Sequence, residues 1–167
     1  AKESGVKRVV FSSSSSVYGD DSHLPKREEV VGKPLSPYAI SKIANEWYGL
    51  NFSELYDIDV IGLRYFNVFG PNQNPEGPYA AVIPIFVENM IQNRPCYING
   101  DGTITRDFTY VQNVVDANIK AAFTTNTQAL NRIYNIAYGE TTSLLDLHTL
   151  IAEALEKKAE PIFREER

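Results

Sequence analysis

Apolar and polar residues alternate along the chain in two distinct periods. Residues 6–11 and 60–65 are short apolar-rich runs with β-branched side chains, as in buried strands of a parallel sheet. Between them, from Pro37 to about Tyr56, apolar residues recur at helical spacing. A strand, a helix and a second strand in this order form the parallel unit of α/β proteins.

The second half of the chain continues the alternation. Helical spacing predicts helices over residues 81–92 and 113–123, and a third that begins at Ser143 with a capping-box-like pattern. Short strands are expected at residues 96–98, 105–110 and 133–136. We therefore predict an α/β fold with a parallel sheet in residues 1–80. Residues 81–167 mainly form a small lobe over the ligand edge of the sheet, and residues of about 111–140 return to the sheet domain.

Composition excludes several classes of function. The 167 residues are 43% hydrophobic and carry a net charge of -5, so the chain can bury a core and is not a polyanion-binding protein such as a nucleic-acid binder. The one cysteine, Cys96, excludes an internal disulfide, and with His23 and His148 it makes no metal-binding pattern. No run is apolar enough to span a membrane, and we expect a cytoplasmic protein.

The candidate chemistry lies at the start of the first predicted helix. Ser36 is a plausible helix cap, and Tyr38 and Lys42 are four residues apart, so they share one face of the helix. An adjacent ammonium stabilises a phenolate, which makes such a pair a possible general base. A Tyr-x-x-x-Lys pattern alone is common, and an exposed tyrosine beside a solvated lysine is the alternative.

A run of five serines, residues 12–16, follows the first predicted strand. The carboxyl ends of parallel strands are where α/β sheets bind ligands. A flexible serine linker is the alternative, but the position at a strand end favours a hydroxyl-lined site.

Four segments together resemble the nucleotide-sugar epimerases of the extended short-chain dehydrogenase/reductase superfamily. They are residues 11–19 (FSSSSSVYG), 36–42 (SPYAISK), 63–71 (LRYFNVFGP) and 99–108 (NGDGTITRDF). The resemblance covers nearly the whole chain, and residues 73–84 and 96–102 are most similar to UDP-N-acetylglucosamine 4-epimerases. It implies a Rossmann-like, doubly wound parallel sheet with a nucleotide-sugar lobe, NAD as cofactor, a UDP-sugar substrate and a homodimer.

The resemblance also separates two reactions. The related 4,6-dehydratases carry Thr-Asp-Glu before Val-Tyr-Gly, where this chain has Ser14, Ser15 and Ser16. Elimination of water needs an added acid and base. The absence of this acid and base favours oxidation at C4 followed by its reduction over elimination of water.

Site residues follow from the resemblance, position by position. Tyr38 would be the base, Lys42 would hold the nicotinamide ribose, and Ser14 would bind the sugar 4-oxygen. Asn67 and Arg106 would hold the pyrophosphate, Tyr97 the uracil and Gln73 the sugar. The implied catalytic set is Ser14, Tyr38 and Lys42; the cofactor set is Ser12, Tyr38, Lys42 and Tyr65; the substrate set is Ser14, Ser15, Ser16, Asn67, Gln73, Tyr97, Asn99, Arg106 and Arg167; no metal is implied.

The chain departs from the family in one respect. The glycine-rich dinucleotide motif is absent, so we expect a fragment that lacks about 110 to 120 preceding residues, has an open sheet edge at its first strand and is inactive by itself. A UDP-glucuronate epimerase or decarboxylase on the same fold, a non-catalytic relative and a truncated gene product are the alternatives.

Overall fold

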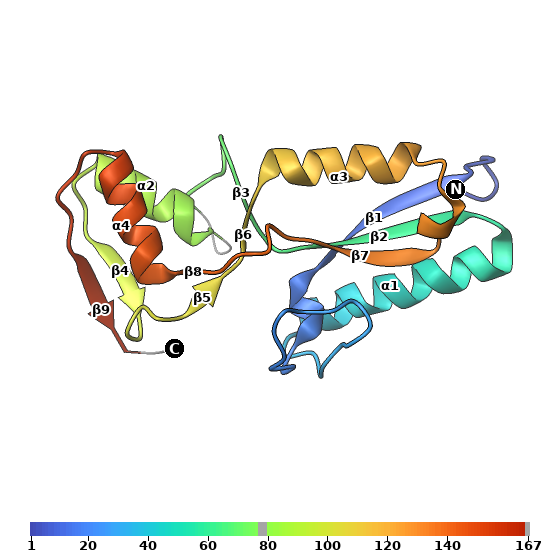
Figure 1. Ribbon diagram of the computed structural model, residues 1–167, viewed down its shortest axis with the longest axis horizontal. Coiled ribbons are helices and arrows are strands. Elements are labelled where there is room, and N and C mark those ends of the chain that lie inside the picture. Colours follow the sequence, from blue (N-terminus) through green and yellow to red (C-terminus); the bar gives the residue numbers. More distant parts are fainter. Residues whose placement is uncertain (77–79, 166–167) are drawn as a thin grey trace. The chain divides into compact units, whose positions relative to one another are not determined.

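The computed structural model describes residues 1–76 and 80–165 (Figure 1). The contacts divide the chain into two compact units. The first consists of Ala1–Val68 and Thr109–Gly139, and the second of Phe69–Phe108 and Glu140–Arg167.

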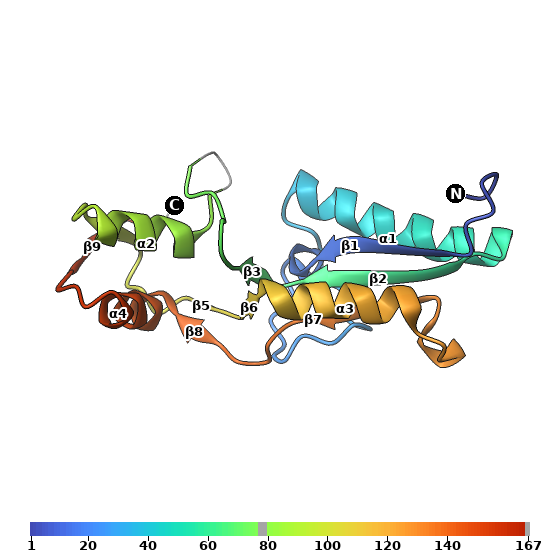
Figure 2. The same cartoon turned by 90° about the horizontal axis from the view of Figure 1, so that it is seen from above.

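The first unit is a three-layered α/β structure. Its parallel sheet has the strand order β1-β2-β7, and helices α1 and α3 cover opposite faces of it (Figures 1 and 2). Ile61 and Leu63 of β2 pack with Ala121 of α3 in one of its apolar clusters. This arrangement is Rossmann-like, which confirms the predicted fold class. The elements are β1 (Arg8–Ser14), the 3-10 helix η1 (Ser15–Tyr18), α1 (Pro37–Tyr56), β2 (Asp59–Tyr65), α3 (Val111–Phe123), the 3-10 helix η2 (Thr127–Ala129) and β7 (Arg132–Ile136).

Strand β1 is longer than the apolar pattern predicts. The expected strand ends at Phe11, but β1 continues through three serines, which pair in register with Leu63, Arg64 and Tyr65 of β2. The backbone of a parallel neighbour offers hydrogen bonds whatever the side chains are, so β2 extends the pairing into the polar run. β1 pairs only with β2 among the described strands and lies at the edge of the sheet.

The second unit is smaller and packs two helices against short strands. Phe86 and Met90 of α2, Cys96 and Ile98 of β4, and Leu147 and Ala152 of α4 form its core. β4 pairs in parallel with β9, and β5 pairs antiparallel with β8. The elements are α2 (Val82–Ile91), β4 (Cys96–Asn99), β5 (Thr105–Arg106), β8 (Thr142–Ser143), α4 (Leu144–Ala154) and β9 (Pro161–Arg164).

Several short strands differ from the predictions. The single strand expected at residues 105–110 is two strands, β5 and β6 (Phe108–Tyr110), which belong to different sheets. Three strands were not predicted, namely β3 (Asn67–Phe69), which is the partner of β6, β8 and β9. Strands of two to four residues have too few positions to show an alternating pattern, so only their partners define them.

His148 lies in the core of the second unit. Its side chain is 2% exposed, its ring meets that of Phe86 edge to face at 5.6 Å, and its Nε2 atom has no hydrogen-bond partner among the described residues. Burial lowers the pKa of His148 below the ordinary histidine value. His148 is therefore a packing residue of this core.

We predict that His148 makes the second unit sensitive to acid. The unfolded chain binds a proton on this imidazole near pH 6.5, whereas the folded chain binds it only at lower pH. The unfolded state therefore binds more protons in this range, and the free energy of unfolding falls as the pH drops below about 6.5. Urea denaturation at about pH 7.5 and about pH 5.5 measures this loss.

The variant His148→Leu should lose less stability between these two pH values than the wild type. The control His23→Gln changes the other histidine, whose side chain is 83% exposed, and should retain the loss. An equal loss in His148→Leu would contradict the assignment.

Candidate active site and nucleotide pocket

Helix α1 begins where the sequence predicts. Ser36 has extended backbone angles and its Oγ accepts a hydrogen bond from Ala39 N at 3.1 Å, while Pro37 occupies the first helical position. The predicted cap is confirmed. It places Tyr38 in the first turn, with its side chain 55% exposed.

Lys42 joins this helix to the end of β1. Its Nζ donates to the Ser12 carbonyl oxygen at 3.0 Å and lies 3.5 Å from Ser12 Oγ. The same ammonium is 5.6 Å from the centre of the Tyr38 ring. The tyrosine and lysine therefore share one face of α1, as their spacing predicts, and that face meets the serine run.

The serines that follow have different environments. Ser14 Oγ accepts a hydrogen bond from Ser16 N at 3.2 Å and caps the 3-10 helix η1. Ser15 is half-buried. Ser16 Oγ is buried and has no hydrogen-bond partner among the described residues. A buried hydroxyl without a partner is rare in proteins, and it indicates that another group can bond here.

Tyr65 lies at the end of β2, beside Ser14 in the sheet register. Its hydroxyl donates to Asn118 Oδ1 of α3 at 3.0 Å. The hydroxyl proton is thus used within the unit, which leaves the ring and the acceptor lone pairs of the hydroxyl for another contact.

The second unit brings three of the predicted substrate residues to one pocket. Tyr97 and Asn99 of β4 and Arg106 of β5 line a pocket of about 430 Å³, together with apolar side chains of α2 and Leu144. Arg106 is exposed, and one of its terminal nitrogens donates to the Thr105 carbonyl at 3.0 Å. A guanidinium has five N–H donors, so this contact leaves donors for an anion.

Sequence analysis missed Arg164. Its guanidinium carbon lies 3.2 Å from the centre of the Tyr97 ring, a stacked cation–π contact, and its backbone pairs with Asn99. The sequence gives only a weak signal for this residue, because the strand that carries Arg164 is four residues long and too short to show an alternating pattern. Arg167, which the resemblance implies as a phosphate ligand, lies outside the described residues.

The other two predicted substrate residues lie in and after β3. Asn67 is exposed at the first position of this strand. Gln73 follows in a turn, where its N–H donates to the Gly70 carbonyl at 3.4 Å.

Sequence analysis also missed a buried cluster of three polar side chains beneath the serine run. Ser13, Glu46 and Arg64 are 2%, 4% and 3% exposed, and each belongs to a different element, β1, α1 or β2. Burial alone would lower the pKa of Arg64, but its hydrogen bonds to Glu46 and Tyr18 outweigh burial and raise this pKa above the ordinary value. The sequence did offer one signal for Glu46. It follows Lys42 by four residues, and this helical spacing places the two residues on neighbouring positions of one helix face.

Two further classes of site have no support in the described part of the chain. No three histidine, cysteine, aspartate or glutamate side chains there come together in a way that could hold a metal ion. None of its helices is both long and apolar enough to cross a membrane.

Three features together define a class of protein: a parallel sheet with helices on both faces, a tyrosine and a lysine four residues apart in the first two turns of a helix, and serines at a strand end. They are the features of a short-chain dehydrogenase/reductase-type Rossmann domain. The chain belongs to the NAD dependent epimerase/dehydratase family, whose sequence model matches residues 1–137.

Similar proteins are known in sequence and in structure. The chain is 39% identical to the UDP-glucose 4-epimerase of Mycolicibacterium smegmatis over 100% of its own length and 52% of the relative's. It is 40% identical to the UDP-N-acetylglucosamine 4-epimerase of Methanobrevibacter ruminantium in complex with UDP-N-acetylmuramic acid, with a TM-score of 0.94 over 99% of this chain and 52% of that one.

A third similar structure contains both a nucleotide sugar and a cofactor. The UDP-glucuronic acid 4-epimerase of Bacillus cereus, in complex with UDP-glucuronic acid and NAD, is 30% identical, with a TM-score of 0.88 over 99% of this chain and 51% of that one. The chain thus spans about half the length of the proteins it matches.

We predict that the cap on α1 contributes to stability. Ser36→Ala removes the acceptor for the Ala39 N–H and should lower the free energy of unfolding by about 1 kcal/mol. Chemical denaturation of the two proteins measures the difference.

Ser41→Ala is the matched control, because the Ser41 hydroxyl donates to the Tyr38 carbonyl inside the same helix and caps nothing. It should change stability by less than roughly 0.5 kcal/mol. If both variants lose the same amount, the Ser36 cap has no special role.

Proposed function

We propose that this chain is the catalytic and nucleotide-binding part of an NAD-dependent UDP-sugar 4-epimerase, with UDP-N-acetylglucosamine and UDP-N-acetylgalactosamine, or their uronic acids, as substrates. The observation that carries the proposal is the Lys42 ammonium, which contacts the end of β1 at Ser12 and lies beside the Tyr38 ring. This places a base candidate, a cation and a row of hydroxyls at one edge of a Rossmann-like sheet.

Tyr38 is the proposed base. It is exposed, so a substrate can reach its hydroxyl, and Lys42 stabilises the phenolate that accepts the proton of the sugar 4-hydroxyl. Ser14 hydrogen-bonds the 4-oxygen as it becomes a ketone, and Ser15 and Ser16 line the sugar site. The unpartnered Ser16 hydroxyl supports this placement, since a sugar hydroxyl would satisfy it.

The residues at the end of β1 fit the nicotinamide end of NAD. The Lys42 ammonium has three N–H donors and makes one hydrogen bond of good length, to the Ser12 carbonyl, so donors remain for the ribose hydroxyls. Ser12 is exposed beside it, and Tyr65 offers its ring. NAD bound there would supply the hydride acceptor for C4 of the sugar and, in its reduced form, the hydride donor to the opposite face.

The pocket of the second unit fits the UDP moiety. We assign the pyrophosphate to Arg106 and the uracil to Tyr97 with the backbone near Asn99. Asn67 and Gln73 do not line this pocket, and the resemblance alone assigns Asn67 to the pyrophosphate and Gln73 to the sugar. Arg167 is kept as a further phosphate ligand. A 4-epimerase holds its nucleotide firmly while the keto sugar rotates to present its opposite face. Strong charge-assisted contacts therefore belong on the phosphates and weak hydroxyl contacts on the sugar.

The serine run also favours epimerisation over dehydration. Ser14, Ser15 and Ser16 stand where the dehydratases carry an acidic pair, and their own side chains are neutral hydroxyls. Without a carboxylate there, nothing in the run can remove a proton from C5.

The first test uses the complete reading frame that contains this chain. Incubated with UDP-N-acetylglucosamine, it should produce UDP-N-acetylgalactosamine, followed by the anomeric proton signals in NMR. Tyr38→Phe should lower the turnover number by at least about a hundredfold, because it removes the proton acceptor.

Tyr48→Phe is the control, since Tyr48 is an exposed tyrosine of the same helix, and it should keep the wild-type rate. If the folded, NAD-bearing protein forms no new N-acetylhexosamine, the assignment of the sugar is wrong, and UDP-glucose and UDP-glucuronate are tried next. Full activity in Tyr38→Phe would refute the role of the base.

Arg106→Gln tests the assignment of the phosphate site. It should raise the KM for the UDP-sugar by about tenfold or more while changing kcat little, because the lost contact holds the nucleotide before and during the reaction. The dissociation constant of UDP, measured by calorimetry, should rise by the same factor.

Arg94→Gln is the control. Arg94 is a half-exposed arginine of the same unit that pairs with Glu88 at 3.2 Å, and it does not line this pocket. Equal effects of the two variants would place the phosphates elsewhere.

A further inference from the structure

A buried polar network joins β1, α1 and β2 directly beneath the candidate site. Glu46 and Arg64 form a two-pronged ion pair, with Nε–Oε1 and a terminal nitrogen–Oε2 distances both of 2.8 Å. Ser13 Oγ donates to the same Glu46 Oε1. All three side chains are at least nine-tenths buried, so these contacts are shielded from water. We call these residues the Ser13–Glu46–Arg64 network.

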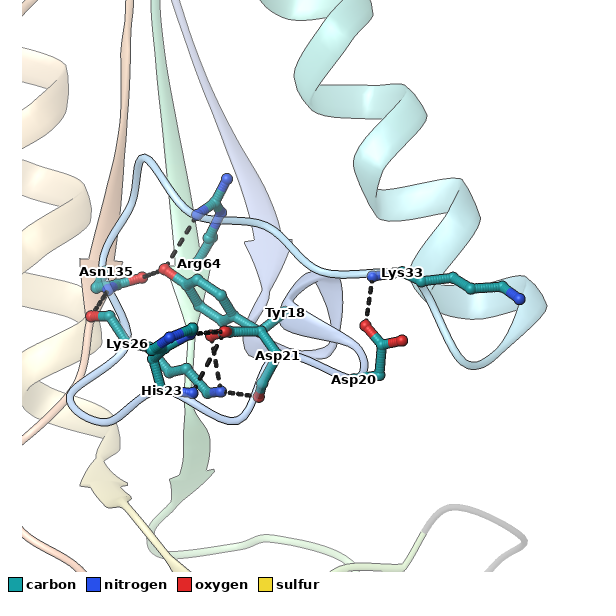
Figure 3. Close-up of polar contacts among 8 residues, drawn as sticks. All are labelled: Tyr18, Asp20, Asp21, His23, Lys26, Lys33, Arg64 and Asn135. Atoms are coloured by element: carbon teal, nitrogen blue, oxygen red, sulfur yellow. Dashed lines mark hydrogen bonds and ion pairs between the residues drawn. The ribbon is translucent and has the colours of Figure 1, made fainter.

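The network continues to the segment that follows β1. A terminal nitrogen of Arg64 donates to the Tyr18 hydroxyl at 3.0 Å, and Tyr18 donates to Asn135 Oδ1 at 2.6 Å (Figure 3). The same nitrogen donates to the Glu28 carbonyl at 3.0 Å. Burial raises the pKa of Tyr18, so the phenol stays neutral and keeps the proton that it donates. Arg64 thereby also holds η1, the short helix that carries Ser15 and Ser16.

Each member of the network is adjacent to a proposed active-site residue. Ser13 lies between Ser12 and Ser14 on β1, and its side chain points to the opposite face of the strand from theirs. Glu46 lies one helical turn after Lys42 and two turns after Tyr38 on α1. The network therefore connects the strand that carries the serines to the helix that carries the base.

Stability alone does not explain such a group. Buried ion pairs lose about as much by desolvation as they gain by attraction, and apolar replacements of similar volume are often as stable. What a two-pronged pair adds is geometry, because its hydrogen bonds form at only one separation and orientation of the two side chains.

We propose that the Ser13–Glu46–Arg64 network is a positioning device that fixes the helix of Tyr38 and Lys42 against the serine run of β1. The proposal rests on the proposed 4-epimerase function, and it assigns to these residues no contact with substrate or cofactor. Ile43 of α1 also packs against Val17 and Tyr18 of η1, but apolar packing is non-directional, and the Lys42 side chain is long and flexible. The network adds hydrogen bonds that form at only one separation and orientation of the helix and the strands. A displacement of about 1 Å between reacting groups can lower a rate about a hundredfold.

The decisive variant combines Ser13→Ala, Glu46→Leu and Arg64→Met. It removes the charges and hydroxyl together, so no buried charge is left unpaired, and its thermal midpoint should stay within a few degrees of the wild type. We expect kcat per NAD-loaded site to fall by about tenfold or more, with the KM for the UDP-sugar changed by less than about threefold. Hydrogen exchange of the first turns of α1 should become faster.

Two further variants keep the test decisive if this one fails to fold. Ser13→Ala deletes a single hydroxyl and leaves the ion pair intact; it should lower kcat several-fold without a matching loss of stability. Ser53→Ala is the control, because it also removes a buried hydroxyl from a contact of α1, here to the Leu50 carbonyl of the same helix, and it should leave kcat unchanged.

The outcomes separate the two proposals. Wild-type kcat and wild-type exchange of α1 in the folded combined variant would overturn the positioning role, and so would an unchanged kcat in Ser13→Ala. If the wild-type protein epimerises no UDP-sugar, the proposed function fails instead, and the hydrogen exchange of α1 alone then decides whether the network positions the helix.

Discussion

The ion pair between Glu46 and Arg64 is the constraint on which the first unit depends. Two charges can stay in an apolar interior only when their hydrogen bonds are nearly all made. Glu46 uses both carboxylate oxygens, and Arg64 contacts Glu46, Tyr18 and the Glu28 carbonyl. The helix, the central strand and the segment after β1 must therefore meet in one arrangement, and the end of β1 is placed by that arrangement.

The serine run shows how one residue type takes several roles. Its sequence has low complexity, but the strand periodicity sends Ser13 into the interior while Ser12 is exposed on the other face. Ser12 accepts from Lys42 through its carbonyl, Ser14 caps η1, and the buried hydroxyl of Ser16 has no partner within residues 1–76 and 80–165. A flexible linker would show no such differences, so the run is part of the folded structure.

The sequence predicted those features whose signals are local. The Ser36 cap, the limits of α1 and the cap of α4 at Ser143 each depend on a few neighbouring residues, and all agree with the structure. Ser13, Glu46, Arg64 and Arg164 were missed because their roles depend on partners from other elements. An arginine within the apolar residues 60–65 was a signal, since a charge in a buried strand requires a counter-charge.

The two units divide the chemistry of the proposed reaction by charge. In the first unit, the candidate groups that face solvent are hydroxyls and one ammonium, and its strong ion pair is buried away from them. In the second, Arg106 is exposed at a pocket, and Arg164 stacks on a tyrosine of the same pocket. A sugar that must rotate in the site between two hydride transfers is better bound by hydroxyls, whose hydrogen bonds exchange at little cost. Its diphosphate is better bound by guanidinium groups, whose charge-assisted bonds persist through the turn.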